Sequence, residues 1–138
     1  ALRIREHSKN ADEIAKFLIS HPKVERVSHP SIASDLAKER ADKYLSGGCG
    51  GLMGFEIKGG VEAGKQFINS LEMFYHVANI GDSRSLAIHP ASTTHSQLNE
   101  EELLSAGVTP GYVRLSIGLE HLDDIKDDLS QALDKVSV

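Results

Sequence analysis

The first twenty residues carry apolar side chains at helical spacing, i, i+3, i+4 and i+7. These positions are Ala11, Ile14, Ala15 and Leu18. Pro22 biases the residue before it away from helical geometry, so the spacing predicts a helix over 1–21. No capping residue or turn precedes Ala1, and we expect this helix to lead in from an element outside the sequence.

The rest of the chain alternates between strand-like and helix-like segments. Alternating or glycine-bounded apolar runs predict strands, and apolar positions at 3.6-residue spacing predict helices. The predicted strands are 24–29, 52–58, 86–88 and 112–117; the predicted helices are 35–45, 61–74, one capped by Asn99, and 122–136. A short apolar run covers 76–80. This order favours an α+β sandwich, with a small, open, mainly antiparallel sheet and helices on one face.

Composition limits the classes of function. The chain has 138 residues, about one domain, and its 40% hydrophobic and 25% charged residues are typical of a globular protein. The net charge of -5 comes without a basic cluster, which argues against a nucleic-acid partner. No apolar run reaches the roughly 18 residues of a membrane span, and the N-terminus is too charged for a signal peptide. We expect a cytoplasmic protein with no membrane partner.

A glycine-rich segment at 47–51 surrounds the only cysteine, Cys49. Glycines can cradle a phosphate when they follow a strand and open a helix. Here they precede the predicted strand at 52–58, which favours a turn or bulge. A single cysteine forms no internal disulfide, and without a matched motif we interpret Cys49 as a bystander.

The seven histidines raise the question of a metal site. Only His89 and His95 are close in a loop, and no HExxH motif or cysteine pair supports a zinc site. Ser92 lies near His95, but a nucleophilic serine would stand in a GxSxG elbow, which the sequence lacks. We expect no metal and interpret Ser92 as a loop hydroxyl.

Arg114 is the residue that the pattern places best for binding. It lies in the middle of a predicted strand, opposite the apolar face formed by Val113, Leu115 and Ile117. Its guanidinium therefore points to the uncovered side of the sheet, where a planar fork of donors matches a carboxylate. The pattern alone favours an ordinary exposed or ion-paired strand arginine over a binding residue.

Two long motifs add to this picture. The segments ANIGDSRSLAIHPASTTH (78–95) and VRLSIGLEHLDDI (113–125) resemble the C-terminal part of the Cys/Met-metabolism pyridoxal-phosphate enzymes, and the resemblance runs from about residue 2 to 136. It implies the C-terminal domain of a fold-type I pyridoxal-phosphate transferase, with residues 1–138 as the substrate-binding domain. In that family the arginine of the RLS motif binds the α-carboxylate of the amino-acid substrate, a role that falls on Arg114.

The resemblance also points to Asn79. In that family, the residue two positions before the Gly-Asp pair helps to hold the carboxylate, and here this residue is Asn79. Lyases of the family tend to have Ser-Leu immediately before the Gly-Asp pair. This chain has Asn79 and Ile80, which favours a sulfhydrylase over a lyase. Either the side chain or the backbone N–H of Asn79 could make the contact.

The resemblance implies pyridoxal phosphate as the cofactor, held by a part of the enzyme that lies upstream. None of the nine lysines stands in the family's Schiff-base motif; they are Lys9, Lys16, Lys23, Lys38, Lys43, Lys58, Lys65, Lys126 and Lys135. The expected partners are the N-terminal cofactor domain, further copies in a homotetramer, and a small amino-acid substrate. A free-standing amino-acid-binding or interaction module of the same fold is the competing hypothesis.

Overall fold

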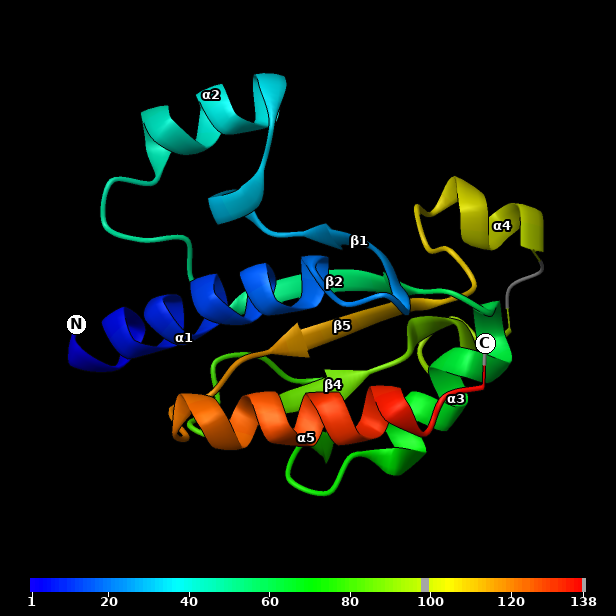
Figure 1. The fold of residues 1–138 in the computed structure, drawn as a ribbon. Helices are drawn as coiled ribbons and strands as arrows, with labels where there is room; N and C mark the ends of the chain where they lie inside the picture. Colours follow the sequence, from blue (N-terminus) through cyan, green and yellow to red (C-terminus); the bar gives the residue numbers. More distant parts are fainter. Residues whose placement is uncertain (98–99, 138) are drawn as a thin grey trace.

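The computed structural model describes residues 1–97 and 100–137 (Figure 1). The helices are α1 (Leu2–Ile19), α2 (Asp35–Tyr44), α3 (Gly60–Ser70), α4 (Glu100–Ser105) and α5 (Leu122–Asp134), with short 3-10 turns η1 (Pro30–Ile32) and η2 (Pro90–Ser92). The strands are β1 (Val24–Ser28), β2 (Leu52–Ile57), β3 (Tyr75–His76), β4 (Leu86–Ile88) and β5 (Tyr112–Ser116). The predicted cap Asn99 lies outside the described residues.

The five strands form one sheet in the order β1-β2-β5-β4-β3. The pairs β1–β2, β2–β5 and β4–β5 are antiparallel, and β3 adds to β4 in parallel. The predicted open, mainly antiparallel sheet is confirmed. β5 is the central strand, with β2 on one side and β4 on the other. Pairing with both neighbours holds its backbone in place.

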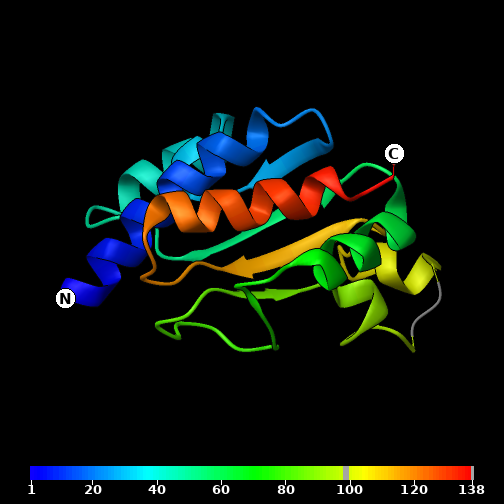
Figure 2. The same ribbon diagram turned by 60° about the horizontal axis from the view of Figure 1, so that its bottom comes forward.

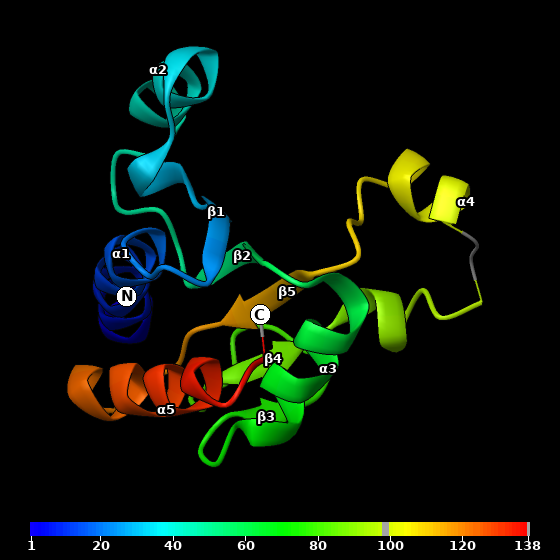
Figure 3. The same ribbon diagram turned by 45° about the vertical axis from the view of Figure 1, so that its right-hand side comes forward.

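Three helices, α1, α3 and α5, cover one face of the sheet (Figures 2 and 3). Their buried apolar side chains pack on those of β2 and β5; the largest are Ile14, Leu18, Phe55, Ile57, Phe67, Leu115, Ile117, Ile125, Leu129 and Leu133. Burying each of these stabilises the fold by about 1.5 to 3 kcal/mol. α2 and α4 lie on the other side (Figure 3), and α2 buries no side chain. No helix in the described part of the chain is long and apolar enough to cross a bilayer.

A β-bulge changes the faces predicted for β1. Strict alternation puts Val24 and Val27 on opposite faces, but the register shifts between Val24 and Arg26. Val24 consequently pairs with Ile57 and Val27 with Phe55, so both valines face the helices. One extra residue in a strand has this effect because side chains alternate with a period of two.

α3 is shorter than its apolar pattern predicted, because a buried carboxylate holds the following residues as a turn. Asp128 on α5 accepts hydrogen bonds from the backbone N–H groups of Glu72 (2.8 Å), Met73 (2.9 Å) and Phe74 (3.1 Å). The helix ends at Ser70. The apolar run predicted at 76–80 contributes only the last residue of β3, and its remainder is a loop.

The end of β5 is tied to α1. His7 Nδ1 lies 2.6 Å from the carbonyl oxygen of Ile117, which can only accept, so Nδ1 carries the proton. Asn10 Nδ2 donates to the carbonyl oxygens of Gly118 (3.2 Å) and Glu120 (3.1 Å). Both side chains are buried. The first helix and the central strand are thus joined by hydrogen bonds as well as by packing.

Candidate carboxylate-binding site

The site begins with Arg114 on the central strand. Val113 and Leu115 are buried among the helices, so the alternation of β5 turns Arg114 to the opposite face of the sheet. We call this opposite face the open face. The neighbours of Arg114 in the sheet are Gly54 on β2 and Ile88 on β4. The predicted orientation of Arg114 is confirmed.

Arg114 contacts the second predicted residue, Asn79, which lies in the loop between β3 and β4. We call residues 77–81 of this loop the strap. Arg114 Nη2 donates to the main-chain carbonyl oxygen of Asn79 over 3.2 Å. Residues 35 positions apart in the sequence are thereby brought together, through the backbone of Asn79.

The other polar atoms of Asn79 have local partners. Its N–H donates to the carbonyl oxygen of Val77 over 3.0 Å, and its Oδ1 accepts from the N–H of Ile80 over 2.9 Å. Asn79 is itself exposed. The side-chain Nδ2 is therefore the polar group of Asn79 that the described contacts leave open to a ligand.

The guanidinium of Arg114 has donors to spare. Its Nε is shielded from solvent and has no hydrogen-bond partner among the described residues. Arginine offers five N–H donors, of which the contact with Asn79 uses one. A hollow of about 240 Å³ adjoins the side chain, and it is lined by Ser28, Pro30, Leu52, Met53, Gly54, Tyr112 and Arg114. A small anion placed in this hollow would meet the unpaired donors.

A glycine beside this hollow, Gly54, makes room for the ring of Tyr112. A Cβ atom at Gly54 would lie 2.0 Å from the hydroxyl oxygen of Tyr112 and 2.4 Å from Cζ, so the ring of Tyr112 occupies the space above Gly54. Burial raises the pKa of the Tyr112 phenol, and the positive charges of Arg114 and Arg26 oppose that rise. The phenol therefore stays protonated and able to donate at neutral pH.

Ionic and aromatic contacts hold the loop on both sides of the strap. The guanidinium of Arg84 lies 4.2 Å from the ring centroid of Tyr75, and its Nε lies 3.5 Å from Asp82. Beyond it, Glu120 accepts from the N–H of Ser85 (2.6 Å) and from its hydroxyl (2.8 Å). The start of β4 is thereby fixed to the turn that follows β5.

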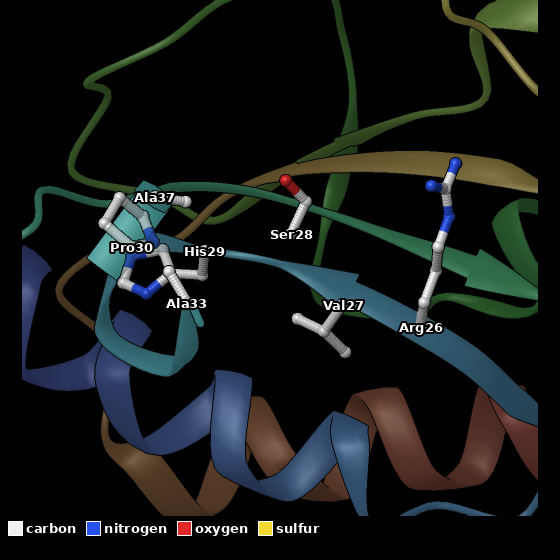
Figure 4. A pocket seen from close by; sticks show the side chains of 7 residues that line it. All are labelled: Arg26, Val27, Ser28, His29, Pro30, Ala33 and Ala37. Atoms are coloured by element: carbon white, nitrogen blue, oxygen red, sulfur yellow. The ribbon is translucent and has the colours of Figure 1, made fainter. Parts of the chain in front are cut away.

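A second hollow, of about 390 Å³, lies beside β1 and η1 (Figure 4). Arg26 and Ser28 project toward the open face, whereas Val27 points toward the helices (Figure 4). The ring of His29 is buried, with Nδ1 2.7 Å from the hydroxyl of Ser31, and burial lowers its pKa. His29 is occupied in holding η1, its Nδ1 lies 3.8 Å from Asp12, and the residues that line the hollow include no carboxylate.

The glycine-rich segment at 47–51 forms a turn against α1. The N–H of Gly50 donates to the hydroxyl of Ser8 over 3.0 Å, and the carbonyl oxygen of Gly51 accepts from Ile117 over 2.8 Å. Gly48 and Gly50 have φ of 119° and 77°, values that favour glycine. The segment leads into β2 and not into a helix, so it lacks the geometry of a phosphate cradle.

His89 is part of the fold. It is fully buried, with Nε2 2.7 Å from the carbonyl oxygen of Pro110 and Nδ1 2.8 Å from the hydroxyl of Ser92. The carbonyl can only accept, so Nε2 carries the proton and Nδ1 accepts from Ser92. Burial lowers the pKa of His89 and keeps it neutral. Ser92 is thus a partner of His89, and the described residues contain no metal-binding group of three or more His, Cys, Asp or Glu.

Tyr112 and Ser116 share the open face with Arg114, and the sequence motifs assigned neither of them a role. The hydroxyl of Ser116 accepts from the N–H of Gly81 in the strap over 3.1 Å. The alternation of β5 was the available signal, because residues two apart share a face. The contact itself depends on where the strap lies, which the sequence pattern does not reveal.

The structure so far defines an α+β domain that presents Arg114 and a backbone strap on the open face of its sheet. The family model for Cys/Met metabolism PLP-dependent enzymes matches residues 1–134. The chain belongs to this family of pyridoxal-phosphate-dependent enzymes.

Individual relatives agree with this family. The chain is 56% identical to O-acetyl-L-homoserine sulfhydrylase of Leptospira meyeri over 98% of its own length and 31% of that protein. It is 44% identical to L-methionine gamma-lyase of Fusobacterium nucleatum subsp. polymorphum, over 98% of its length and 34% of the lyase. The chain therefore spans about a third of the length of these relatives.

The fold recurs in a solved structure. A Campylobacter jejuni subsp. jejuni protein, provisionally assigned as an O-acetylhomoserine (thiol)-lyase, superimposes with a TM-score of 0.89 at 47% identity. The match covers 96% of this chain and 32% of that protein, which carries N'-pyridoxyl-lysine-5'-monophosphate at its position 205. The predicted family, fold class and cofactor are confirmed.

Proposed function

We propose that residues 1–138 are the C-terminal substrate-binding domain of a sulfhydrylase that converts O-acetylhomoserine and sulfide to homocysteine and acetate. Support comes from the relatives, since the chain is 56% identical to the Leptospira sulfhydrylase and 48% identical to O-acetyl-L-homoserine sulfhydrylase 1 of Thermus thermophilus. In this proposal α1 leads in from the cofactor domain, and the complete enzyme is a cytoplasmic homotetramer.

The observation that carries the proposal is the unpaired Nε of Arg114. A donor that is shielded from water and left without a partner costs free energy, and native proteins avoid this outside functional sites. A carboxylate in the adjoining hollow would satisfy Nε together with a neighbouring Nη proton, as a two-pronged charge-assisted pair. We therefore assign to Arg114 the binding of the substrate's α-carboxylate.

Asn79 completes the site in this proposal. Its carbonyl oxygen orients the guanidinium, and its Nδ2 can donate to the second carboxylate oxygen. The backbone N–H is the alternative donor, but it would first have to leave the carbonyl oxygen of Val77. The described contacts favour the side chain.

The described residues do not fit the phosphate or the lysine linkage of the cofactor. The glycine-rich turn is engaged with Ser8, and none of the nine lysines is buried. The family's cofactor supplies the sink for electrons during the reaction. In our proposal the rest of the enzyme holds the cofactor, and this domain orients the substrate. Orientation accelerates the reaction because it holds the reacting atoms in place.

A methionine gamma-lyase is the second candidate, supported by the 44% identity to L-methionine gamma-lyases. The Asn79–Ile80 pair, in place of Ser-Leu, favours the sulfhydrylase. The test is to assay the complete enzyme in parallel for homocysteine from O-acetylhomoserine and sulfide, and for methanethiol from methionine. Methanethiol as the dominant product would replace the sulfhydrylase by the lyase.

A free-standing binding module remains the alternative of another class. The intact mass of the protein from its native source separates the two, because a module has the mass of this domain whereas the proposed enzyme is about three times as long as the chain, like its relatives. Recovery of a 15.0 kDa protein alone would rule out the enzyme.

A further inference from the structure

We propose that Ser116 is a positioning residue for the carboxylate site: its buried hydroxyl holds the strap against β5 and thereby sets the place of Asn79 relative to Arg114. The inference rests on the proposed function, in which Arg114 and Asn79 bind the substrate's carboxylate. It adds a residue that does not itself touch the substrate.

Two parallel hydrogen bonds join the strap to the central strand. Arg114 Nη2 donates to the carbonyl oxygen of Asn79, and two residues further along both segments the N–H of Gly81 donates to Ser116 Oγ over 3.1 Å. Arg114 and Ser116 share the open face because they are two residues apart on one strand. Ser116 is only 4% exposed, so the acceptor of this bond is buried, whereas the donor residue Gly81 is exposed.

The strap has little else to hold it. The exposed fractions of Val77 and Ile80 are 47% and 58%, so neither is packed in the core. Its other recorded hydrogen bonds run to near neighbours, such as that from Asn79 N–H to Val77. Among the described residues, the two bonds to Arg114 and Ser116 are the hydrogen bonds that join the strap to β5, and the N–H of Val77 also donates to the carbonyl oxygen of Tyr75 on β3 over 3.1 Å.

These two bonds differ in what the substrate does to them. The bond to Asn79 comes from the same guanidinium that receives the carboxylate, so its geometry depends on whether the site is filled. The bond between Gly81 and Ser116 involves no group of Arg114 and persists. Ser116 is thus the contact that keeps the strap in place during binding.

The surroundings of Ser116 allow a conservative rescue. Ser116 lines a hollow of about 190 Å³ together with Ile4, Leu52 and Ile80. A threonine at this position keeps the hydroxyl and adds one methyl group, for which the hollow has room. Alanine removes the hydroxyl and leaves the N–H of Gly81 without its partner.

The test uses the complete enzyme with its cofactor and two unreactive probes. Norleucine carries the α-carboxylate, and pentylamine is the same molecule without it. Affinities are measured by titrating the cofactor's absorbance in the wild type and in Ser116→Ala, Ser116→Thr and Ser83→Ala. Ser83 is the matched control, because its exposed hydroxyl has one hydrogen bond within the described part of the chain, to its neighbour Asp82. Circular dichroism checks that each variant is folded.

Ser116→Ala is expected to weaken the affinity for norleucine about three- to tenfold, which is the effect of one lost hydrogen bond. The affinity for pentylamine should be unchanged. Ser116→Thr should restore norleucine binding to within about twofold of wild type, and Ser83→Ala should match the wild type. An unchanged norleucine affinity in folded Ser116→Ala, or an equal loss for pentylamine, overturns the proposal.

A further variant separates this inference from the proposed function. Arg114→Lys removes the fork that grips the carboxylate. If Arg114→Lys loses norleucine affinity and Ser116→Ala does not, only the positioning role fails. If Arg114→Lys keeps full affinity, the carboxylate site itself is elsewhere.

Discussion

Arg114 and Asn79 meet through a hydrogen bond from the guanidinium to a main-chain carbonyl oxygen, 3.2 Å apart. The contact joins the central strand of the sheet to an exposed loop. Because the bond uses the backbone of Asn79, it would form with other residues at that position. The side chain of Asn79 is thereby left to act on the ligand.

Arg114→Lys in the complete enzyme is expected to raise the KM for O-acetylhomoserine about 10- to 100-fold. An ammonium group cannot reproduce two parallel hydrogen bonds, and bonds to charged groups contribute about 1.5 to 3 kcal/mol. Steady-state kinetics measure the effect. Arg40→Lys on the exposed helix α2 is the control and should change nothing. Wild-type kinetics in Arg114→Lys would remove Arg114 from the site.

Asn79→Ala is expected to cost about 1 to 3 kcal/mol of substrate binding, because it leaves a carboxylate oxygen one hydrogen bond short. The carbonyl that orients Arg114 is kept, so kcat should change less than KM. Competition by norleucine against the substrate provides the measurement.

Asn79→Pro tests the alternative contact by removing the backbone N–H. If the backbone holds the carboxylate, this variant loses affinity while Asn79→Ala retains it. Circular dichroism is needed here, since proline can distort the end of the strap. Full affinity in both folded variants would reduce the site to Arg114.

The isolated 138-residue chain is expected to hold no pyridoxal phosphate after dialysis and to form no homocysteine. Its lysines are not buried, and its glycine-rich turn is occupied by Ser8. The absorbance of the dialysed protein decides the matter. A retained band of a protein-bound cofactor would show that this chain contains a cofactor site of its own.

Gly54→Ala is expected to destabilise the domain by about 1 to 3 kcal/mol, because its Cβ would overlap the ring of Tyr112. The measurement is unfolding in urea. Gly47→Ala is the matched control, since a Cβ there meets nothing within 4 Å. Adding Tyr112→Leu to Gly54→Ala should recover most of the loss. Equal stability of the wild type and Gly54→Ala would mean that the ring moves without cost.

Local patterns predicted most of the fold. The alternation of β5 predicted which face of the sheet Arg114 and its neighbours lie on, and helical spacing predicted α1 and α5. The predictions were wrong where a residue distant in the sequence determines the local structure. Asp128 ends α3 from 54 to 56 residues away, and the bulge in β1 depends on its pairing with β2.

The candidate site was predictable to a smaller extent. The face of Arg114 follows from the strand pattern, but its role and that of Asn79 came from the resemblance to a family. The unpaired Nε, the space above Gly54 and the bond from Gly81 to Ser116 all arise from tertiary packing. Such features have no signature in local spacing.

The hydrogen bonds of His7 and Asn10 couple α1 to the end of the strand that carries Arg114. His7 donates to the carbonyl oxygen of Ile117, three residues beyond Arg114. Asn10 donates to the carbonyl oxygens of Gly118 and Glu120, in the turn that follows. A shift of α1 along its axis would pull on the end of β5. If α1 connects to a cofactor domain as proposed, a movement of α1 would be transmitted through these bonds to the strand that carries Arg114.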